Sequence, residues 1–338
     1  MKKPSLPACA LLALTLLFSM VQPASALPWN NKETPASQSQ SLSDPAQVNQ
    51  PPIARNMELS TYKNVALTGY FDAVDNDGDV LTFQLTSTPA RGAVTLSEDG
   101  SSQFIYTPYE NKTGKDSFSY VAIDSAGNTS QEAKIKIRIE KPSTKVTYAD
   151  MDRSSAHKAA IRLAENGIYV GAYHGGQYFF QPDQPVSRGE FLSLAMAVSG
   201  LEPLEEITLT GFSDDSSIPT WCKGYISSAL KAGVVQGCRN EEGDHVFQAN
   251  QTITMAEATV ILNDLLGVSD VPAETFAPDG LDHWAGQYAA NLAASGVIRP
   301  EDTGFYAMSQ CLCRADTALL LDGALELLEN RDGSGRFF

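Results

Sequence analysis

Two different spacings of apolar residues divide this chain. Between residues 53 and 140, short apolar runs are separated by turn-forming clusters such as residues 75–78, Asp-Asn-Asp-Gly. The run at residues 133–139, Ala-Lys-Ile-Lys-Ile-Arg-Ile, alternates strictly and gives a strand one apolar and one charged face. Several short strands with such turns are typical of a β-sandwich. The expected strands are residues 65–71, 80–85, 93–96, 103–107, 117–123 and 133–139.

From Val146 onward the apolar spacing is helical, and the pattern repeats. Tyr148, Phe212 and Phe276 open three units at equal intervals of 64 residues, and Asp follows each aromatic residue closely. Within a unit, an amphipathic helix ends at a glycine that suits a left-handed C-cap, and a loop leads to a second helix. A helix, loop and helix repeated three times predict a repeat architecture. The glycines that end the first helices are Gly167, Gly233 and Gly296.

Each second helix begins with a recurring tetrad. It reads Ser-Arg-Gly-Glu at residues 187–190, Thr-Met-Ala-Glu at 254–257 and Cys-Arg-Ala-Asp at 313–316. Ser or Thr followed three residues later by Glu is a capping box, which is a sufficient structural explanation for Glu190 and Glu257.

Capping does not require the arginines of these tetrads, Arg188 and Arg314. Each is expected beside free N–H groups at the positive end of a helix dipole. A guanidinium in that position predicts a site for a carboxylate or phosphate. The alternative is a surface salt bridge to an acidic neighbour, and the residues alone leave both interpretations open.

The three units resemble S-layer homology modules. The resemblance covers residues 147–330 and rests on the aromatic-x-Asp openings, the His283-Trp284 pair, the loop at residues 175–182 and the helix start at residues 186–191. It implies an all-α, pseudo-three-fold helical bundle whose inter-repeat grooves bind the secondary polysaccharide of a bacterial cell wall. In many members that polymer carries anionic pyruvate ketals. The family's groove arginine maps onto Arg188 and Arg314 of this chain.

Departures from the family pattern predict one or two working grooves, not three. Met255 replaces the arginine of unit two, and Ser155 stands where the other units have Trp221 and Trp284. Cys313 is a weaker capping acceptor than Thr. The two tryptophans are candidate polysaccharide contacts, but we expect core positions for them because a buried Trp contributes a large apolar area.

The sandwich resembles the cadherin-like, immunoglobulin-like tandem modules of bacterial surface proteins. The matching segments are residues 73–83, 104–108, 116–120 and 122–127. Members often serve as spacers and some bind calcium, which takes six to eight oxygen ligands. An acidic hairpin tip is the alternative, since Asn-Asp-Gly forms turns unaided. The candidate metal ligands are Asp72, Asp75, Asp77, Asp79 and Asp124.

The charge balance limits the choice of partners. With 24 Lys and Arg against 40 Asp and Glu, the net charge is −16, and −18 without the first 26 residues. Nucleic-acid binding is excluded because it depends on neutralising phosphates. Residues 141–338 alone have a net charge of −13, so an anionic polymer would not be steered towards them. We therefore expect moderate salt or a divalent cation to strengthen binding between residues 141–338 and an anionic polymer.

The first 26 residues have the pattern of a signal peptide. Lys2 and Lys3 precede an apolar run at residues 10–21, and Ala-Ser-Ala ends at Ala26. That run is shorter than the roughly 20 residues that span a bilayer, and no other run is long enough. Residues 27–52 are polar and Pro-rich and predict a disordered linker. The chain is therefore expected to be secreted, with no transmembrane segment.

Four cysteines lie beyond the predicted signal peptide: Cys222, Cys238, Cys311 and Cys313. They allow three pairings, which spacing cannot choose between. Because the last three lie in or beside the loops between helices, we expect a bridge from Cys238 to Cys311 or Cys313. If free, Cys313 would have a lowered pKa at its helix N-terminus.

We therefore predict that this chain is a non-catalytic cell-surface protein. Its repeats would hold it non-covalently on the cell wall, and the sandwich would serve as a spacer. The alternative is an adhesin whose sandwich binds a glycan or a surface or host protein, with calcium as a candidate cofactor. A hydrolase is disfavoured because all four His lie in the repeats and the sandwich has none. The predicted parts are the signal peptide 1–26, the linker 27–52, the all-β sandwich 53–140 and the repeats 147–203, 210–268 and 275–330.

Overall fold

The computed structural model describes residues 49–272, 283–298 and 307–334. The predicted signal peptide and nearly all of the predicted linker lie outside these ranges. Among the residues that the structure describes, no helix has both the length and the apolar character needed to cross a bilayer.

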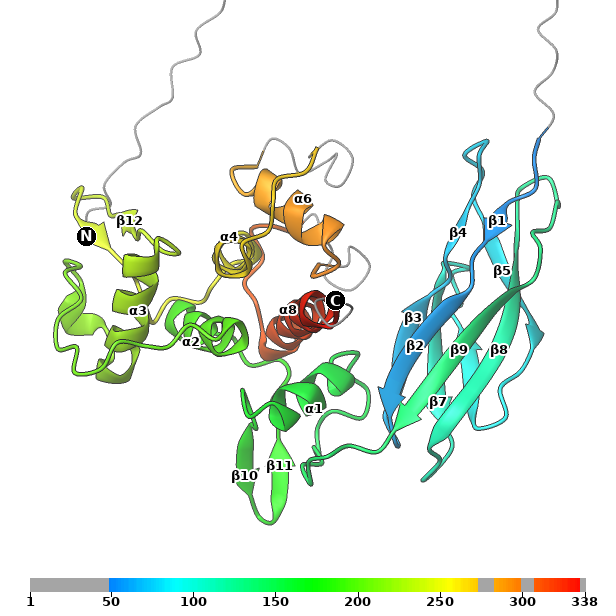
Figure 1. Ribbon diagram of the computed structural model, residues 1–338, viewed down its shortest axis with the longest axis horizontal. Coiled ribbons are helices and arrows are strands. Elements are labelled where there is room, and N and C mark those ends of the chain that lie inside the picture. The colour runs from blue at the N-terminus through cyan, green and yellow to red at the C-terminus, as the bar shows by residue number, and fades with distance from the viewer. Residues whose placement is uncertain (1–48, 273–282, 299–306, 335–338) are drawn as a thin grey trace, which may run out of the picture. The chain divides into compact units, whose positions relative to one another are not determined.

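The N-terminal region is a sandwich of two sheets (Figure 1). One sheet has the order β2-β9-β8-β5 and the other β3-β7-β6, while β1 and β4 form a separate pair. All pairings are antiparallel except that of β2 with β9, which is parallel. The strands are β1 (Ile53–Ala54), β2 (Met57–Tyr62), β3 (Leu67–Tyr70), β4 (Ala73–Val74), β5 (Thr82–Ser87), β6 (Gly92–Leu96), β7 (Gln103–Pro108), β8 (Gly114–Ile123) and β9 (Ala133–Glu140).

Strand β9 shows why these residues form a sandwich. Its burial alternates without exception, with Ile135, Ile137 and Ile139 inside and the charged residues between them exposed. The aromatic side chains of Phe104 and Phe118 meet the isoleucines in the core, edge to face at 5.4 Å between ring centroids. Full burial of each such side chain contributes about 1.5–3 kcal/mol. The prediction of a β-rich N-terminal region is confirmed.

The C-terminal region alternates first and second helices, with a short hairpin between the helices of the first two units (Figure 1). Glycines with left-handed backbones follow the first helices as predicted, with φ of 68° at Gly167, 80° at Gly233 and 76° at Gly296. The elements are α1 (His157–Glu165), β10 (Ala172–His174), β11 (Gln177–Phe179), α2 (Arg188–Ser199), the 3-10 turn η1 (Asp215–Ser217), α3 (Thr220–Ala232), β12 (Cys238–Arg239), β13 (His245–Val246), α4 (Met255–Leu266), α6 (Gly286–Ala294) and α8 (Arg314–Ser334).

In units one and two, the Asp of the unit opening accepts hydrogen bonds from the end of that unit's loop. Asp150 accepts hydrogen bonds from the backbone N–H groups of residues 180 and 181, at 2.9 and 2.7 Å. Asp214 accepts the same pair from residues 247 and 248, at 2.9 and 2.8 Å. The recurring aromatic-x-Asp motif therefore has a structural explanation in units one and two. The equivalent Asp279 lies outside the described residues.

Three segments from the three units are joined in a closed ring of backbone hydrogen bonds. The N–H of Val186 donates to the carbonyl of Leu312 at 3.1 Å, Leu312 donates to Ile253 at 2.9 Å, and Ile253 donates to Val186 at 3.0 Å. All three side chains are buried. Each residue stands directly before the capping residue of a second helix, so the ring fixes where α2, α4 and α8 begin.

Candidate functional site

The predicted capping boxes are present at the starts of α2 and α4. The Ser187 hydroxyl accepts from the N–H of Glu190, whose carboxylate accepts from the N–H of Ser187 at 2.8 Å. Thr254 and Glu257 repeat both bonds. At α8, Asp316 accepts from the Cys313 backbone N–H at 2.9 Å. The two predicted capping boxes are confirmed. The start of α8 keeps one half of such a box, the hydrogen bond from the Cys313 N–H to the Asp316 carboxylate.

The backbone N–H groups at these helix starts are not free, so that part of the anion-site prediction is wrong. The N–H of Arg188 donates to the carbonyl of Gln251 at 2.8 Å, and the N–H of Arg314 donates to Gln184 at 2.9 Å. The next N–H in each helix donates to the same neighbouring loops. Because adjoining units consume these donors, only the guanidinium groups remain to bind an anion.

The first candidate site lies beside Arg314, between the start of α8 and the first unit. We call it the Arg314 groove, and its cavity measures about 200 Å³. Arg314 donates to the Phe180 carbonyl at 3.3 Å and to Gln181 Oε1 at 2.6 Å, and its guanidinium lies 5.5 Å from the centre of the Tyr169 ring. Among the described residues Arg314 forms no salt bridge, so its charge is available. The groove is defined by Tyr169, Phe180, Glu190, Ser193, Arg314 and Thr317.

A buried hydroxyl marks the same groove. Thr317 is only 2% exposed, and its Oγ1 has no hydrogen-bond partner among the described residues. Leaving a buried polar group unpaired costs about 1–3 kcal/mol, a cost that a polar ligand atom in the groove would remove. Burial also raises the pKa of Tyr169, although Arg314 opposes it, so the phenol is neutral at physiological pH. Neither Tyr169 nor Thr317 belongs to the sequence motif, and only the fold brings them to Arg314.

A second candidate, the Arg188 groove, lies between the start of α2 and the second unit, with a cavity of about 290 Å³. Here Arg188 Nη2 lies 2.8 Å from Glu257 Oε1, and the two side chains are only 14% and 24% exposed. The carboxylate of Asp264 also lines the groove. The salt-bridge interpretation, left open by the sequence, is therefore correct for Arg188. The groove is defined by Arg188, Phe247, Glu257, Asp264, Trp284 and Tyr288.

Both candidate tryptophans are exposed, so the prediction that they lie in the core is wrong. Trp221 is 52% exposed and Trp284 is 64% exposed. Trp284 lines the Arg188 groove. Trp221 precedes the fully buried Cys222, whose sulfur packs so tightly against Gly189 that a side chain there would clash. This contact anchors Trp221 at the start of α2, where Glu190 also lies.

The two departures from the repeat pattern fall at the same junction. Helix α1 packs on α8 as α3 packs on α2 and α6 on α4. Ser155, in the place of the tryptophan, lies two residues before α1, and Met255, in the place of the arginine, donates its N–H to the unit-three loop at Gln310. Met255 is itself buried at 2% exposure. One junction therefore lacks both groups, whereas Trp284 lines the Arg188 groove and Trp221 adjoins Cys222 at the start of α2, where the Arg314 groove has Glu190.

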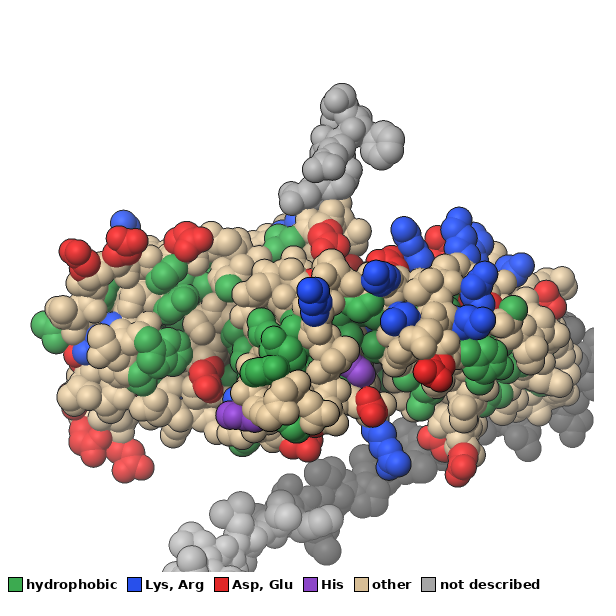
Figure 2. All heavy atoms as spheres, turned by 90° about the horizontal axis from the view of Figure 1, so that it is seen from below, with side chains coloured by type: hydrophobic (Ala, Val, Ile, Leu, Met, Phe, Trp, Pro, Cys, Tyr) green, Lys and Arg blue, Asp and Glu red, His purple; other side chains and the backbone are tan. Residues whose placement is uncertain are grey.

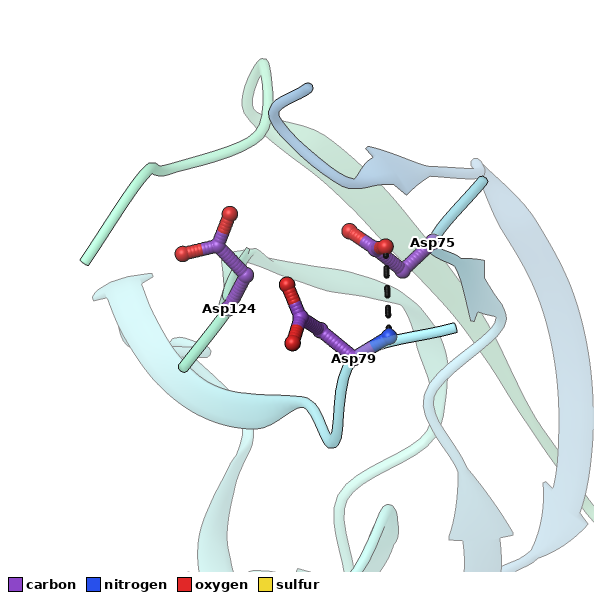
Figure 3. Close-up of side chains that lie close together, drawn as sticks. All are labelled: Asp75, Asp79 and Asp124. Atoms are coloured by element: carbon purple, nitrogen blue, oxygen red, sulfur yellow. Dashed lines mark hydrogen bonds between the residues drawn. The ribbon is translucent and has the colours of Figure 1, made fainter. Parts of the chain in front are cut away.

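The structure gathers three of the five predicted metal ligands at one tip of the sandwich (Figure 3). Carboxylate oxygens of Asp75, Asp79 and Asp124 lie within 4.8 Å of one another. Asp72 is apart from them, paired with Arg55 at 3.1 Å, and Asp77 accepts a backbone N–H at 2.6 Å.

Within this cluster, one oxygen is conspicuous. Asp75 Oδ1 accepts the N–H of Asp79 at 3.3 Å, whereas Asp75 Oδ2 is buried and has no partner among the described residues. Burial would raise the pKa of Asp124, but hydrogen bonds from Asn128 and nearby backbone N–H groups hold it below its usual value. Asp124 is therefore ionised at neutral pH, and the three carboxylates together offer the hard oxygen ligands that Ca²⁺ takes.

Comparison with family models identifies both regions. Residues 49–138 match the bacterial Ig domain, and residues 142–192 and 211–259 match the S-layer homology domain. The chain is an S-layer homology protein with an N-terminal bacterial Ig domain. S-layer homology domains bind cell-wall polysaccharide, so the protein is associated with the bacterial cell surface.

Relatives of this S-layer homology protein are much longer. A cell surface protein of Thermoanaerobacter kivui is 29% identical over 188 residues, which is 53% of this chain and 21% of the relative. Exoglucanase XynX of Acetivibrio thermocellus is 28% identical over 192 residues, 55% of this chain and 17% of the relative. The chain thus spans about a fifth or less of these relatives. Among solved structures, a variant of the SrpA adhesin of Streptococcus sanguinis is 18% identical in sequence. The match covers 37% of this chain and 81% of the adhesin chain, with a TM-score of 0.23.

The cysteines of the S-layer homology protein differ from prediction. All four are free, so the expected bridge from Cys238 to Cys311 or Cys313 is wrong. The Cys238 thiol faces its own hairpin, at 3.7 Å from the Val246 carbonyl, whereas the Cys313 thiol lies 3.0 Å from Asp316 at the start of α8. Burial and the Asp316 carboxylate raise the pKa of Cys313, so the predicted lowering is also wrong. A helix N-terminus does not activate a thiol that is buried against a carboxylate.

Proposed function

We propose that this protein is a non-catalytic anchor that holds itself on the cell wall by binding an anionic, pyruvylated secondary polysaccharide through its helical units. The observation that carries the proposal is the Arg314 groove. It combines an uncompensated guanidinium, an aromatic ring beneath it and the unpaired hydroxyl of Thr317. The sandwich serves as the displayed spacer.

The scaffold we propose is a pseudo-three-fold bundle of units 147–203, 210–268 and 275–330. Three equivalent backbone bonds support it, since Val186, Ile253 and Leu312 each donate to one and accept from another. Such closure creates three junctions between units. Two of them form grooves lined by an arginine, and Trp284 lines one of these grooves.

Binding in the Arg314 groove would use three contacts. A ketal carboxylate would pair with the Arg314 guanidinium, which matches carboxylates with two parallel hydrogen bonds. A sugar hydroxyl would satisfy Thr317, and the exposed face of Trp221 would stack on a sugar ring. The Arg188 groove is the weaker site because the Arg188 guanidinium already forms a salt bridge with Glu257.

The absence of catalysis is part of the proposal. Relatives named as glycosidases share only the S-layer homology region with this chain, and that module is an anchor. The sequence of residues 53–140 contains no histidine, and its gathered carboxylates lie at a sandwich tip.

The decisive experiment is sedimentation of the protein with purified wall sacculi, before and after their secondary polysaccharide is removed. We expect binding to intact sacculi, loss of binding on polysaccharide removal, and strong weakening by Arg314→Ala. The matched control is Arg239→Ala, which removes an exposed arginine on β12 whose side chain donates to the loop carbonyl of Gly243. Equal binding to stripped sacculi would overturn the proposal and favour an adhesin that acts through the sandwich.

We also propose that Asp75, Asp79 and Asp124 bind calcium. Three converging carboxylates and the unpaired Asp75 Oδ2 support this site. Calcium should raise the melting temperature of the wild-type sandwich because an ion that binds only the folded state stabilises it. Asp79→Asn should abolish the rise, whereas Asp77→Asn, outside the cluster, should keep it. An identical response of both variants to calcium would refute the site.

A further inference from the structure

The outer face of the sheet β2-β9-β8-β5 gathers positive charge in a protein that is otherwise acidic. Lys134, Lys136 and Arg138 alternate along β9 and are all exposed. Lys115, on β8, is exposed and lies directly opposite Arg138 in the strand register. Figure 2 shows Lys and Arg side chains gathered over the sandwich, at the right of the view. We call Lys115, Lys134, Lys136 and Arg138 the basic face.

This arrangement works against the stability of the sheet. Like charges on directly opposite residues are destabilising, and Lys115 and Arg138 are such a pair. Lys136 pairs with Glu58 at 2.6 Å and Arg138 pairs with Glu140 at 3.1 Å, but all four side chains are largely exposed. Exposed pairs of this kind contribute only about 0–1 kcal/mol. Folding alone does not account for the basic face.

The four cations line a hollow of about 620 Å³ together with only two carboxylates. One of these, Asp116, is already engaged by the backbone N–H groups of Ala90 and Arg91 and by the Tyr106 hydroxyl at 2.7 Å. The other is Glu58, the surface partner of Lys136. The sandwich as a whole has 12 acidic and 8 basic residues, so half of its cations lie in this one hollow.

We propose that the basic face binds a linear polysaccharide carrying carboxylate or phosphate groups. Alternate residues of a strand are about 7 Å apart, and the neighbouring strand is about 5 Å away, so the cations form a regular row with one lateral branch. An extended polyanion meets such a row at several points without a deep pocket. Charge complementarity argues for this occupant. The sandwich thereby becomes a second contact with anionic polymer, in addition to the spacer role proposed above.

The salt response distinguishes this surface from the grooves. Binding to the exposed basic face depends on charges that salt screens, so affinity should fall as ionic strength rises. The acidic repeats are expected to behave in the opposite way, because salt weakens their repulsion of an anionic polymer. One protein should therefore contain two polymer contacts with opposite salt dependence.

The test is calorimetric titration of the full chain with polygalacturonate, with polyphosphate to compare anion types, and with neutral dextran as the uncharged probe. Titrations at about 0.02 and about 0.5 M NaCl cover weak and strong screening. We expect both polyanions to bind at low salt and dextran not to bind. Lys134→Glu/Lys136→Glu should weaken polyanion binding about tenfold, which corresponds to about 1.4 kcal/mol.

The matched control is Lys112→Glu/Lys141→Glu, which makes the same charge change at two exposed lysines off the basic face. It should change affinity less than about twofold. Arg188→Ala/Arg314→Ala should weaken sedimentation with wall sacculi without removing the salt-sensitive polyanion binding that Lys134→Glu/Lys136→Glu removes, so failure of the grooves and failure of the basic face remain distinguishable. Circular dichroism checks that each variant is folded.

Three results would overturn the inference. The first is no binding of either polyanion at low salt. The second is equal loss in the reversal and control variants, which would indicate unspecific attraction. The third is self-association of the wild-type chain that the reversal abolishes, because the basic face would then bind the acidic tip of a second copy.

Discussion

The Arg314 and Arg188 grooves begin from the same tetrad position and end in different electrostatic states. Arg188 is held by Glu257, the capping glutamate of the neighbouring unit. The Arg314 groove also contains a capping glutamate, Glu190. Arg314, however, donates its hydrogen bonds to the Phe180 carbonyl and to the Gln181 side chain. The motif supplies the cation, whereas contacts with the adjoining unit determine whether the cation is available to a ligand.

The strongest test of this comparison removes each arginine in turn. Arg314→Ala should weaken binding of polysaccharide released from sacculi by about 30-fold, roughly 2 kcal/mol, because a charge-assisted contact is lost. Arg188→Ala should weaken it only about threefold, since its charge is already neutralised. Titration calorimetry measures both. Equal losses would show that the Glu257 salt bridge does not limit the Arg188 groove.

The tryptophans should affect binding without affecting folding. Trp221→Ala should reduce affinity about tenfold through lost stacking, and Trp284→Ala should reduce it less, in proportion to the weaker groove. Because both side chains are more than half exposed, the free energy of unfolding should change by under about 0.5 kcal/mol. Urea unfolding provides the check. A large loss of stability in either variant would restore the core interpretation.

Glu257→Gln should make the two grooves more alike. Gln keeps the capping box but removes the negative charge beside Arg188. In an Arg314→Ala background, we expect Glu257→Gln to raise the affinity for the released polysaccharide about threefold to fivefold. Glu190→Gln is the control, because Glu190 makes the same capping bonds and, within the described ranges, forms no salt bridge with an arginine. If both substitutions gave the same gain, general charge reduction would be the explanation.

A change of pH should weaken both grooves together, through the scaffold. Burial lowers the pKa of His157 below the ordinary histidine value of about 6.5, against the opposing effect of Asp152 and Asp150. The unfolded chain therefore takes up the proton first, so stability is complete above about pH 6.5 and falls as the pH drops towards the folded pKa. A loss of about 1 kcal/mol would lower the melting temperature by about 2–4 °C.

Two histidine variants isolate this effect. His157→Gln should flatten the dependence of melting temperature on pH between neutral and mildly acidic conditions, whereas His174→Gln, at an exposed position, should retain it. An unchanged slope in His157→Gln would assign the acid sensitivity to other groups.

What the sequence predicted well was set by neighbours along the chain. The alternation in β9, the glycine after each first helix and the boxes at Ser187 and Thr254 involve residues at most a few positions apart. Strand β2 was missed, since its residues show no clean alternation and it pairs in parallel with β9, about 78 positions away.

The site depended on contacts between units, which periodicity does not reveal. The partner of Arg188 is 69 residues away, and Gln181, which contacts Arg314, is 133 residues away. The same holds for the exposure of Trp221 and Trp284, because identical spacing within a repeat suits either a core or a groove position. Motif spacing selected Arg188 and Arg314 as candidates but could not rank them.

The ring formed by Val186, Ile253 and Leu312 also fixes the number of units in this architecture. An open stack of repeats can lengthen by one unit at either end, and its terminal units need polar outer faces. A closed ring has no terminal unit, so a fourth unit would find no donor or acceptor left to join. Loss of one unit would instead open two edges at once. A chain with a single such unit would have to recruit two further copies of itself, making subunit number the equivalent of repeat number.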